Sequence, residues 1–204
     1  MAFVQPTPEQ EARETATATF DRDRATWGFL PNYARTFALR PEAYRAWQHL
    51  NATIKSTMDQ RRYELVTVAA AAALRSSYCT LAHGRVLAEH FLPAEDVVRL
   101  IADRATAPLD PVEHAVVAFA EKVALHADRI TEDEVDGLRA VGLTDEEIFD
   151  VVLAAAARCF FARTLDATGT AADAAFREMP PDLVDVLTVG RAVADPPDVG
   201  VETR

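Results

Sequence analysis

The sequence predicts an all-α protein, and three observations carry this prediction. Half of the 204 residues are apolar, which is enough for a sizeable core. Alanine is abundant while glycine is limited to seven residues, and both features favour helices over strands. Apolar residues recur at spacings of three and four along much of the chain, and no period-two alternation typical of strands stands out. We expect about eight to ten helices.

The length favours a single domain, which we place over residues 1–190. Residues 106–111 contain two prolines and form the most plausible linker, so a two-half organisation around this segment stays open. Residues 191–204 carry a Pro-Pro pair and are expected to form a disordered tail.

Residues that interrupt a helix mark where the first helices should end and begin. A polar helix should end near Gly28, because Pro31 fixes its own φ and excludes the residue before it from the helical region. Asn32 is a natural helix cap. From residue 40 to about 56, an amphipathic helix is predicted by a row of apolar residues, Ala43, Trp47, Leu50 and Ile54.

The central helix is predicted from Asp59, a suitable cap, to Leu74. It is apolar nearly all round, as expected for a helix buried by its neighbours or by another subunit. Residues 75–77 should break it, and the next helix should run from Cys79 to Phe91.

Later helices are marked by their own start and stop signals. Pro93 should begin a short helix over residues 94–102, and another helix is expected over residues 112–127. Two capping boxes mark further helices, and Gly142 and Gly169 should end them; the boxes are Thr131 with Glu134 and Thr144 with Glu147. Residues 171–190 suggest one or two short helices, interrupted at the Pro-Pro pair 180–181.

Charge and cysteine content exclude several classes of function. The formal net charge of −11 would repel phosphate backbones, so we expect no nucleic-acid partner. The two cysteines cannot build a disulfide framework and suit a reducing compartment. The start lacks the basic-then-apolar layout of a signal peptide, and no uncharged apolar run reaches about 18 residues. We expect a soluble cytoplasmic protein without membrane contact.

Residues 64–83 contain the candidate catalytic side chains. Cys79 and His83 are four residues apart, so on one helix their Cβ atoms lie roughly 5–6 Å from each other. Cys79 would sit in the first turn of that helix behind Ser76 as N-cap, where free N–H groups favour a thiolate. Glu64 opens an apolar run, and a buried carboxylate there needs a partner. These three side chains are not a distinctive metal-ligand set, so we predict no metal and no cofactor.

The spacing of these residues, E-x11-S-x2-C-x3-H, resembles a family motif. The AhpD-like alkyl hydroperoxidase branch of the carboxymuconolactone decarboxylase family has E-x11-C-x2-C-x3-H, and Ser76 stands at its first cysteine. Residues 28–32 (GFLPN), 38–47 (ALRPEAYRAW) and 109–123 (LDPVEHAVVAFAEKV) also look like the peroxidase-related members. The resemblance implies an AhpD-like helical fold that forms homo-oligomers, often trimers or hexamers. In the family, residues 28–32 tend to lie near the active-site entrance, so Trp27, Phe29 and Leu30 either line a pocket or pack in the core.

The resemblance also implies roles for the site residues. Cys79 would react with the peroxide, and Glu64 and His83 would move protons. Ser76 replaces the resolving cysteine, so it either caps the helix or hydrogen-bonds the Cys79 sulfur. Turnover would then need an external thiol or dithiol reductant, or else Cys159, which otherwise reads as a core residue.

One further departure concerns the family's Asn-Arg pair, which is Ala162-Arg163 here. It leaves Arg163 as an interface or pocket cation.

The leading hypothesis is therefore a thiol-dependent peroxidase that reduces hydroperoxides through Cys79. A second hypothesis is lyase or isomerase chemistry on a small carboxylated lactone, with His83 and Glu64 as acid and base and no thiol nucleophile. A third is a redox sensor or assembly protein that retains only the fold.

Overall fold

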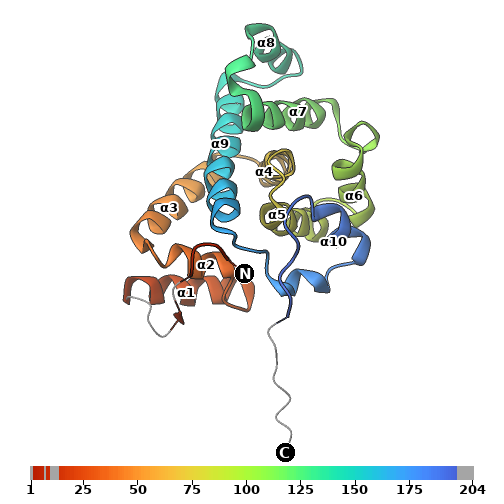
Figure 1. Ribbon diagram of the computed structural model, residues 1–204. Helices are drawn as coiled ribbons and strands as arrows, with labels where there is room; N and C mark the ends of the chain where they lie inside the picture. The colour runs from red at the N-terminus through yellow and green to blue at the C-terminus, as the bar shows by residue number, and fades with distance from the viewer. Residues whose placement is uncertain (1, 7, 10–13, 197–204) are drawn as a thin grey trace, which may run out of the picture.

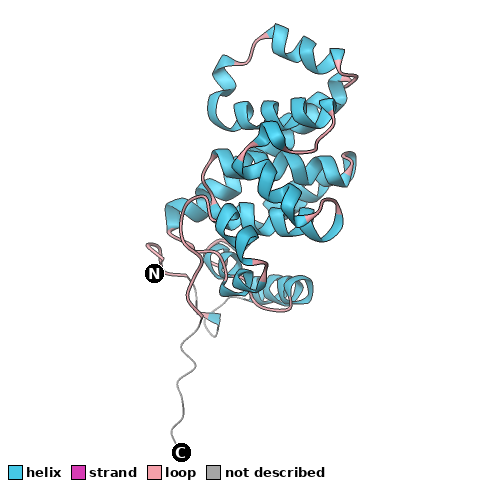
Figure 2. Cartoon of the chain, turned by 90° about the vertical axis from the view of Figure 1, so that its right-hand side faces the viewer, coloured by secondary structure: helices cyan, strands magenta, loops and turns pink. Residues whose placement is uncertain are grey.

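The computed structural model describes residues 2–6, 8, 9 and 14–196, and over these residues the chain contains helices and no strands (Figure 2). The predicted all-α class is confirmed. Ten α-helices occur in the described part of the chain: α1 Glu14–Trp27, α2 Asn32–Phe37, α3 Pro41–Thr57, α4 Gln60–Ala73, α5 Ser77–His90, α6 Ala94–Ala102, α7 Pro111–His126, α8 Glu132–Ala140, α9 Asp145–Thr168 and α10 Pro181–Leu187.

Helix α4 is the centre of the molecule, with α5, α7 and α9 packed around it (Figure 1). Every residue from 63 to 71 is buried. The sequence left open whether neighbours or another subunit cover this helix, and helices of the same chain do so. Its apolar surface therefore gives no support to the predicted oligomer.

The break between α4 and α5 falls where the sequence predicts it. Arg75 takes the left-handed conformation with φ 59°, which reverses the chain between the two helices. The segment after α10 closes over this junction, because the Gly190 amide donates to Ser77 Oγ at 2.8 Å. The first turn of α5 is thus held from the C-terminal end of the chain.

Most capping signals are confirmed. The Asp59 carboxylate accepts from the Arg62 amide at 2.9 Å, the predicted boxes open α8 and α9, and Gly169 ends α9 with φ 73°. The prediction for Asn32 is wrong. Pro31 occupies the cap position, and the Asn32 side chain instead donates to the Ala171 carbonyl at 3.2 Å.

The predicted apolar row of α3 is only partly buried. Tyr44 and Ile54 are buried, whereas Leu50 is 50% exposed. The helix is rotated toward Tyr44 because this ring and Trp47 join an aromatic cluster with Phe161 of α9.

The segment after α10 does not leave the fold at residue 191. Val193 is buried, and the Ala194 amide donates to the Ala172 carbonyl at 2.8 Å. Val193 and Ala194 of the predicted tail therefore pack against the body, and residues 197–204 lie outside the described residues. Within the described chain, no helix has the length and apolarity needed to cross a membrane.

Candidate active site

Cys79 lies in the first turn of α5 and is 1% exposed. The N-terminal N–H groups of a helix stabilise negative charge at this position. A second source of positive charge faces the sulfur, since Nη1 of Arg158 lies 3.6 Å from Sγ and donates to it. Cys79 therefore lies between the N-terminus of a helix and a buried guanidinium.

Arg158 comes from the middle of α9 and is 3% exposed. Burial opposes its charge, but the Cys79 sulfur and the Tyr63 hydroxyl outweigh burial and raise the pKa of Arg158. Its Nε is buried without a hydrogen-bond partner. Arg158 was not among the predicted site residues, although a lone arginine within AAAARCFF is itself a signal, because a charge in an apolar helix needs a partner.

His83 follows Cys79 by one turn of α5, and its Nδ1 lies 2.5 Å from Glu64 Oε2. The other oxygen of Glu64 accepts from Lys55 Nζ at 3.1 Å. Burial opposes the carboxylate charge, but His83 and Lys55 prevail and lower the pKa of Glu64 to about 2. Glu64 is thus an ionised buried carboxylate with the partners that the sequence required.

Burial and the nearby Arg158 guanidinium lower the pKa of His83, against the opposing pull of Glu64. The imidazole is therefore neutral at pH 7. Because Glu64 is ionised and can only accept, Nδ1 of His83 carries the proton, and Nε2 keeps a free lone pair. The arrangement leaves His83 as a base one helical turn from the thiol.

Cys79, His83 and Arg158 line one cavity of about 160 Å³ between α3, α5 and α9. Trp27 lines it as well, whereas Phe29 and Leu30 do not, and Leu30 belongs to the core. Glu64 lies behind His83, outside the lining. The complete lining is Trp27, Tyr33, Tyr44, Trp47, Asn51, Tyr78, Cys79, Ala82, His83, Arg158 and Phe161.

Ser76 fits neither of its predicted roles. It stands at the N-cap position of α5, but its side chain caps no backbone N–H group. Its buried Oγ has no hydrogen-bond partner at normal distance, so it does not bond the Cys79 sulfur. Burial raises the pKa of the Asp166 carboxyl, and the Ser76 hydroxyl partly offsets this rise.

The remaining candidates lie outside the cavity lining. Cys159 is half-buried on α9, and burial raises the pKa of its thiol. Arg163 is exposed and does not line the cavity, so the pocket-cation alternative is wrong and the interface alternative stays a prediction. Arg158, five residues earlier, is the cation in the cavity lining. Among the described residues, no group of three His, Cys, Asp or Glu side chains is placed to hold a metal ion.

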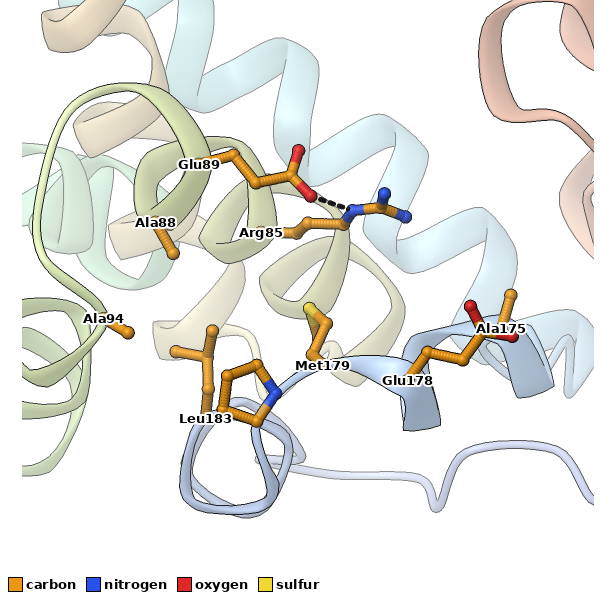
Figure 3. Close-up of a pocket in the computed structure, with 9 residues that line it drawn as sticks. Arg85, Ala88, Glu89, Ala94, Ala175, Glu178, Met179 and Leu183 are labelled. Atoms are coloured by element: carbon orange, nitrogen blue, oxygen red, sulfur yellow. Dashed lines mark hydrogen bonds and ion pairs between the residues drawn. The ribbon is translucent and has the colours of Figure 1, made fainter.

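A larger cavity of about 360 Å³ lies between α5, α6 and α10 (Figure 3). The ion pair of Arg85 and Glu89 crosses one side of it, and Met179 and Leu183 face it from the other. Its lining holds no cysteine and no histidine. The smaller cavity at Cys79 is therefore the candidate active site.

Solved structures with the same fold define the class of this protein. The alkylhydroperoxidase AhpD core of a peroxidase-related protein from Ralstonia eutropha JMP134 is similar with a TM-score of 0.78 and 24% identity, covering 86% of this chain and 94% of that one. A peroxidase-related protein from Silicibacter sp. TM1040 gives a TM-score of 0.73, 21% identity and coverages of 86% and 91%. The chain is therefore an all-helical protein of AhpD-like fold.

Residues 41–122 match the carboxymuconolactone decarboxylase family. The matched residues make up less than half of the chain, which shares its fold with the AhpD-like structures described above. A search of curated proteins gives no match.

Another similar structure widens the range of chemistry found on this fold. The debrominase Bmp8, solved as a cysteine-to-alanine variant with 2,3,4-tribromopyrrole, has a TM-score of 0.74 and 19% identity, covering 90% of this chain and 96% of that one.

Proposed function

We propose that this protein is a thiol-dependent peroxidase that reduces organic hydroperoxides through Cys79. One observation carries the proposal: Arg158 donates to the Cys79 sulfur at 3.6 Å, while His83, one turn along the same helix, is bonded to ionised Glu64. A cation and a base beside a cysteine are what an activated nucleophile needs.

In the first step, Nε2 of His83 accepts the proton of the Cys79 thiol, and the imidazolium is stabilised by Glu64. The thiolate attacks the terminal oxygen of the hydroperoxide. The S–O bond forms and the O–O bond breaks; the sulfenic acid keeps the proton of the attacked oxygen. The leaving alkoxide takes the proton from His83 and departs as an alcohol.

Return to the thiol requires an external reductant. Ser76 cannot form a disulfide, and Cys159 is outside the cavity lining. A small thiol attacks the sulfenic acid, which releases water and leaves a mixed disulfide. A second thiol then displaces Cys79 from this disulfide, so two thiols are oxidised for each hydroperoxide reduced.

Peroxide consumption with dithiothreitol as reductant tests the proposal. We expect multiple turnovers for the wild type and the matched control Cys159→Ser, and none for Cys79→Ser. Oxidation of Cys79 without turnover in any thiol system would instead indicate a redox sensor. Loss of activity on a carboxylated lactone in His83 and Glu64 variants, with Cys79→Ser unaffected, would indicate a lyase.

A second candidate is reductive removal of bromine from a bromoaromatic compound, as the name and ligand of the Bmp8 debrominase suggest. The aromatic lining around Cys79 favours it. Overall, a C–Br bond would become C–H, two thiols would become a disulfide, and bromide would be released. Bromide release from 2,3,4-tribromopyrrole with dithiothreitol, dependent on Cys79, distinguishes this reaction from peroxide reduction.

A further inference from the structure

Aromatic rings form most of the wall of the Cys79 cavity. Four groups that can hydrogen-bond a substrate, Cys79, His83, Arg158 and Asn51, share the lining with Ala82 and six aromatic side chains. These six come from five separate parts of the chain and are Trp27, Tyr33, Tyr44, Trp47, Tyr78 and Phe161. A general apolar pocket would need no such concentration of rings.

The hydroxyl groups of the three tyrosines are already engaged by protein groups. Tyr44 donates to the buried carboxylate of Asp23 at 3.2 Å. Tyr78 donates to the buried carboxylate of Asp173. The Tyr33 oxygen accepts from Trp27 Nε1 at 3.0 Å. These bonds fix the rings in place, so the tyrosines offer ring surface to the cavity.

Stacking holds the rest of the wall in position. Trp47 stacks on Phe161 with ring centroids 4.3 Å apart, and Tyr44 lies nearly parallel to Trp47, 6.2 Å away. A prearranged wall binds a rigid ligand at low entropic cost. The volume of about 160 Å³ also suits one ring, since an apolar cavity of about 150 Å³ accommodates benzene.

We infer that this cavity selects substrates carrying a single aromatic ring, which packs against the fixed ring wall while the reacting group faces Cys79. This inference rests on the proposed function for the reaction, but the binding preference stands apart from it. Edge-to-face and offset contacts with several rings distinguish an aromatic ligand from a saturated one of equal size.

Binding of two matched alcohols tests the preference without any reaction. We expect 2-phenyl-2-propanol to bind the wild-type protein roughly tenfold more tightly than 2-cyclohexyl-2-propanol in calorimetric titration. Equal or tighter binding of the cyclohexyl compound, or no binding of either, would overturn the inference.

Two variants locate the binding. Trp47→Leu removes one face of the wall, and Ala82→Leu fills the cavity from α5 without removing a ring. Both should weaken phenyl binding at least about tenfold, whereas the surface change Leu125→Ala should not. Phenyl binding that survives Ala82→Leu in a folded protein would place the ligand elsewhere and contradict the inference.

Kinetics separate the inference from the proposed function. Cumene hydroperoxide should oxidise Cys79 roughly tenfold faster than tert-butyl hydroperoxide at equal low concentration. If no peroxide oxidises Cys79 but the phenyl alcohol still binds in the cavity, the ring preference holds and the peroxidase proposal fails. Oxidation at equal rates, without selective binding, would reject the ring preference and leave the peroxidase proposal intact.

Discussion

Arg158 and Cys79 form a buried pair in which the guanidinium donates to the sulfur. A guanidinium left unpaired in this core would carry a large desolvation cost. The Nη1–Sγ contact of 3.6 Å offsets part of that cost if the sulfur is a thiolate. Burial, together with this arginine, lowers the pKa of His83 and so keeps the neighbouring base neutral.

The first prediction concerns this pair. Replacing Arg158 with methionine keeps the bulk of the side chain and removes the charge, so the rate of Cys79 oxidation should fall about 100-fold. Arg163→Met, on the exposed side of the same helix, is the matched control and should leave the rate unchanged. The measurement is the second-order rate of sulfenic acid formation. A folded Arg158→Met protein with the wild-type rate would show that Arg158 does not assist the oxidation of Cys79.

The second prediction concerns proton transfer. His83 must be neutral to accept a proton, and its pKa lies below the ordinary value of 6.5, so the oxidation rate should fall only at pH values below 6.5. Glu64 raises the pKa of His83. Glu64→Gln removes this effect, so the acidic fall should move to lower pH and the plateau rate should drop at least about tenfold.

The control for this change is Glu89→Gln, which removes an exposed carboxylate from the same helix as His83. Its pH profile should coincide with that of the wild type. An acidic fall that moves to higher pH in Glu64→Gln would contradict the assigned direction.

How far these residues could be predicted depends on their separation along the chain. Cys79 and His83 lie on one helix, so their proximity follows from helix geometry. The bond between Glu64 and His83 joins two helices, and only the resemblance to the family motif pointed to it. Arg158 is 79 residues from Cys79, and helix periodicity does not say which helices meet at that distance.

The junction of α4 and α5 places the first turn of α5 in the core. Arg75 makes the reversal, and Gly190 fits against it so closely that an added Cβ would lie 2.0 Å from the Arg75 carbonyl oxygen. The C-terminal segment thereby braces the turn that carries Cys79.

The third prediction tests this contact. Gly190→Ala should lower the free energy of unfolding by about 1–3 kcal/mol, because backbone atoms must move to make room. Gly137→Ala is the matched control; it lies in an exposed part of α8 with no atom within 4 Å of the added Cβ, and should raise the free energy by about 0.5–1 kcal/mol. Urea unfolding measures both. Equal effects of the two substitutions would show that Gly190 is not closely packed.

Helix boundaries were predictable because their signals are local. The Asp59 cap, the boxes at Thr131 and Thr144, and the stop at Gly169 each act within one turn of the chain. The orientation of α3 was not predictable in the same way, because Trp47 stacks on a ring that lies more than a hundred residues away. Asn32 was misassigned for a similar reason: its partner is the Ala171 carbonyl.

Across the whole molecule, two buried carboxylates give opposite dependences of stability on pH. Burial raises the pKa of Asp23 to about 6, despite the hydrogen bond from Tyr44, whereas the pKa of Glu64 falls to about 2. The folded protein therefore binds the Asp23 proton more tightly than the unfolded chain does. Ionisation of Asp23 therefore lowers the stability of the protein as pH rises from about 4 to 6. Protonation of Glu64 lowers it as pH falls from about 4.5 to 2.

The fourth prediction isolates Asp23. A difference of about two pKa units corresponds to roughly 3 kcal/mol. Asp23→Asn should therefore increase the free energy of unfolding, relative to wild type, by up to about 3 kcal/mol more at pH 8 than at pH 4. Urea unfolding at the two pH values gives this difference. The same offset at both pH values would mean that the Asp23 carboxyl titrates normally.

The whole-molecule architecture was predictable in class, because composition and periodicity determine that the chain is helical. The sequence did not show whether α4 is buried within a single chain. An apolar helix has the same sequence pattern whether its own chain or another subunit covers it. The predicted homo-oligomer stays a prediction.

The central claim is that Cys79 is the reactive thiol and Cys159 is not. One equivalent of cumene hydroperoxide, added to the reduced protein and followed by peptide mass spectrometry with sulfenic-acid trapping, tests it most directly. We predict that Cys79 gains one oxygen while Cys159 stays reduced, and that Cys79→Ser leaves the peroxide unconsumed. Oxidation of Cys159 with Cys79 still reduced, or equal slow oxidation of both, would contradict the account.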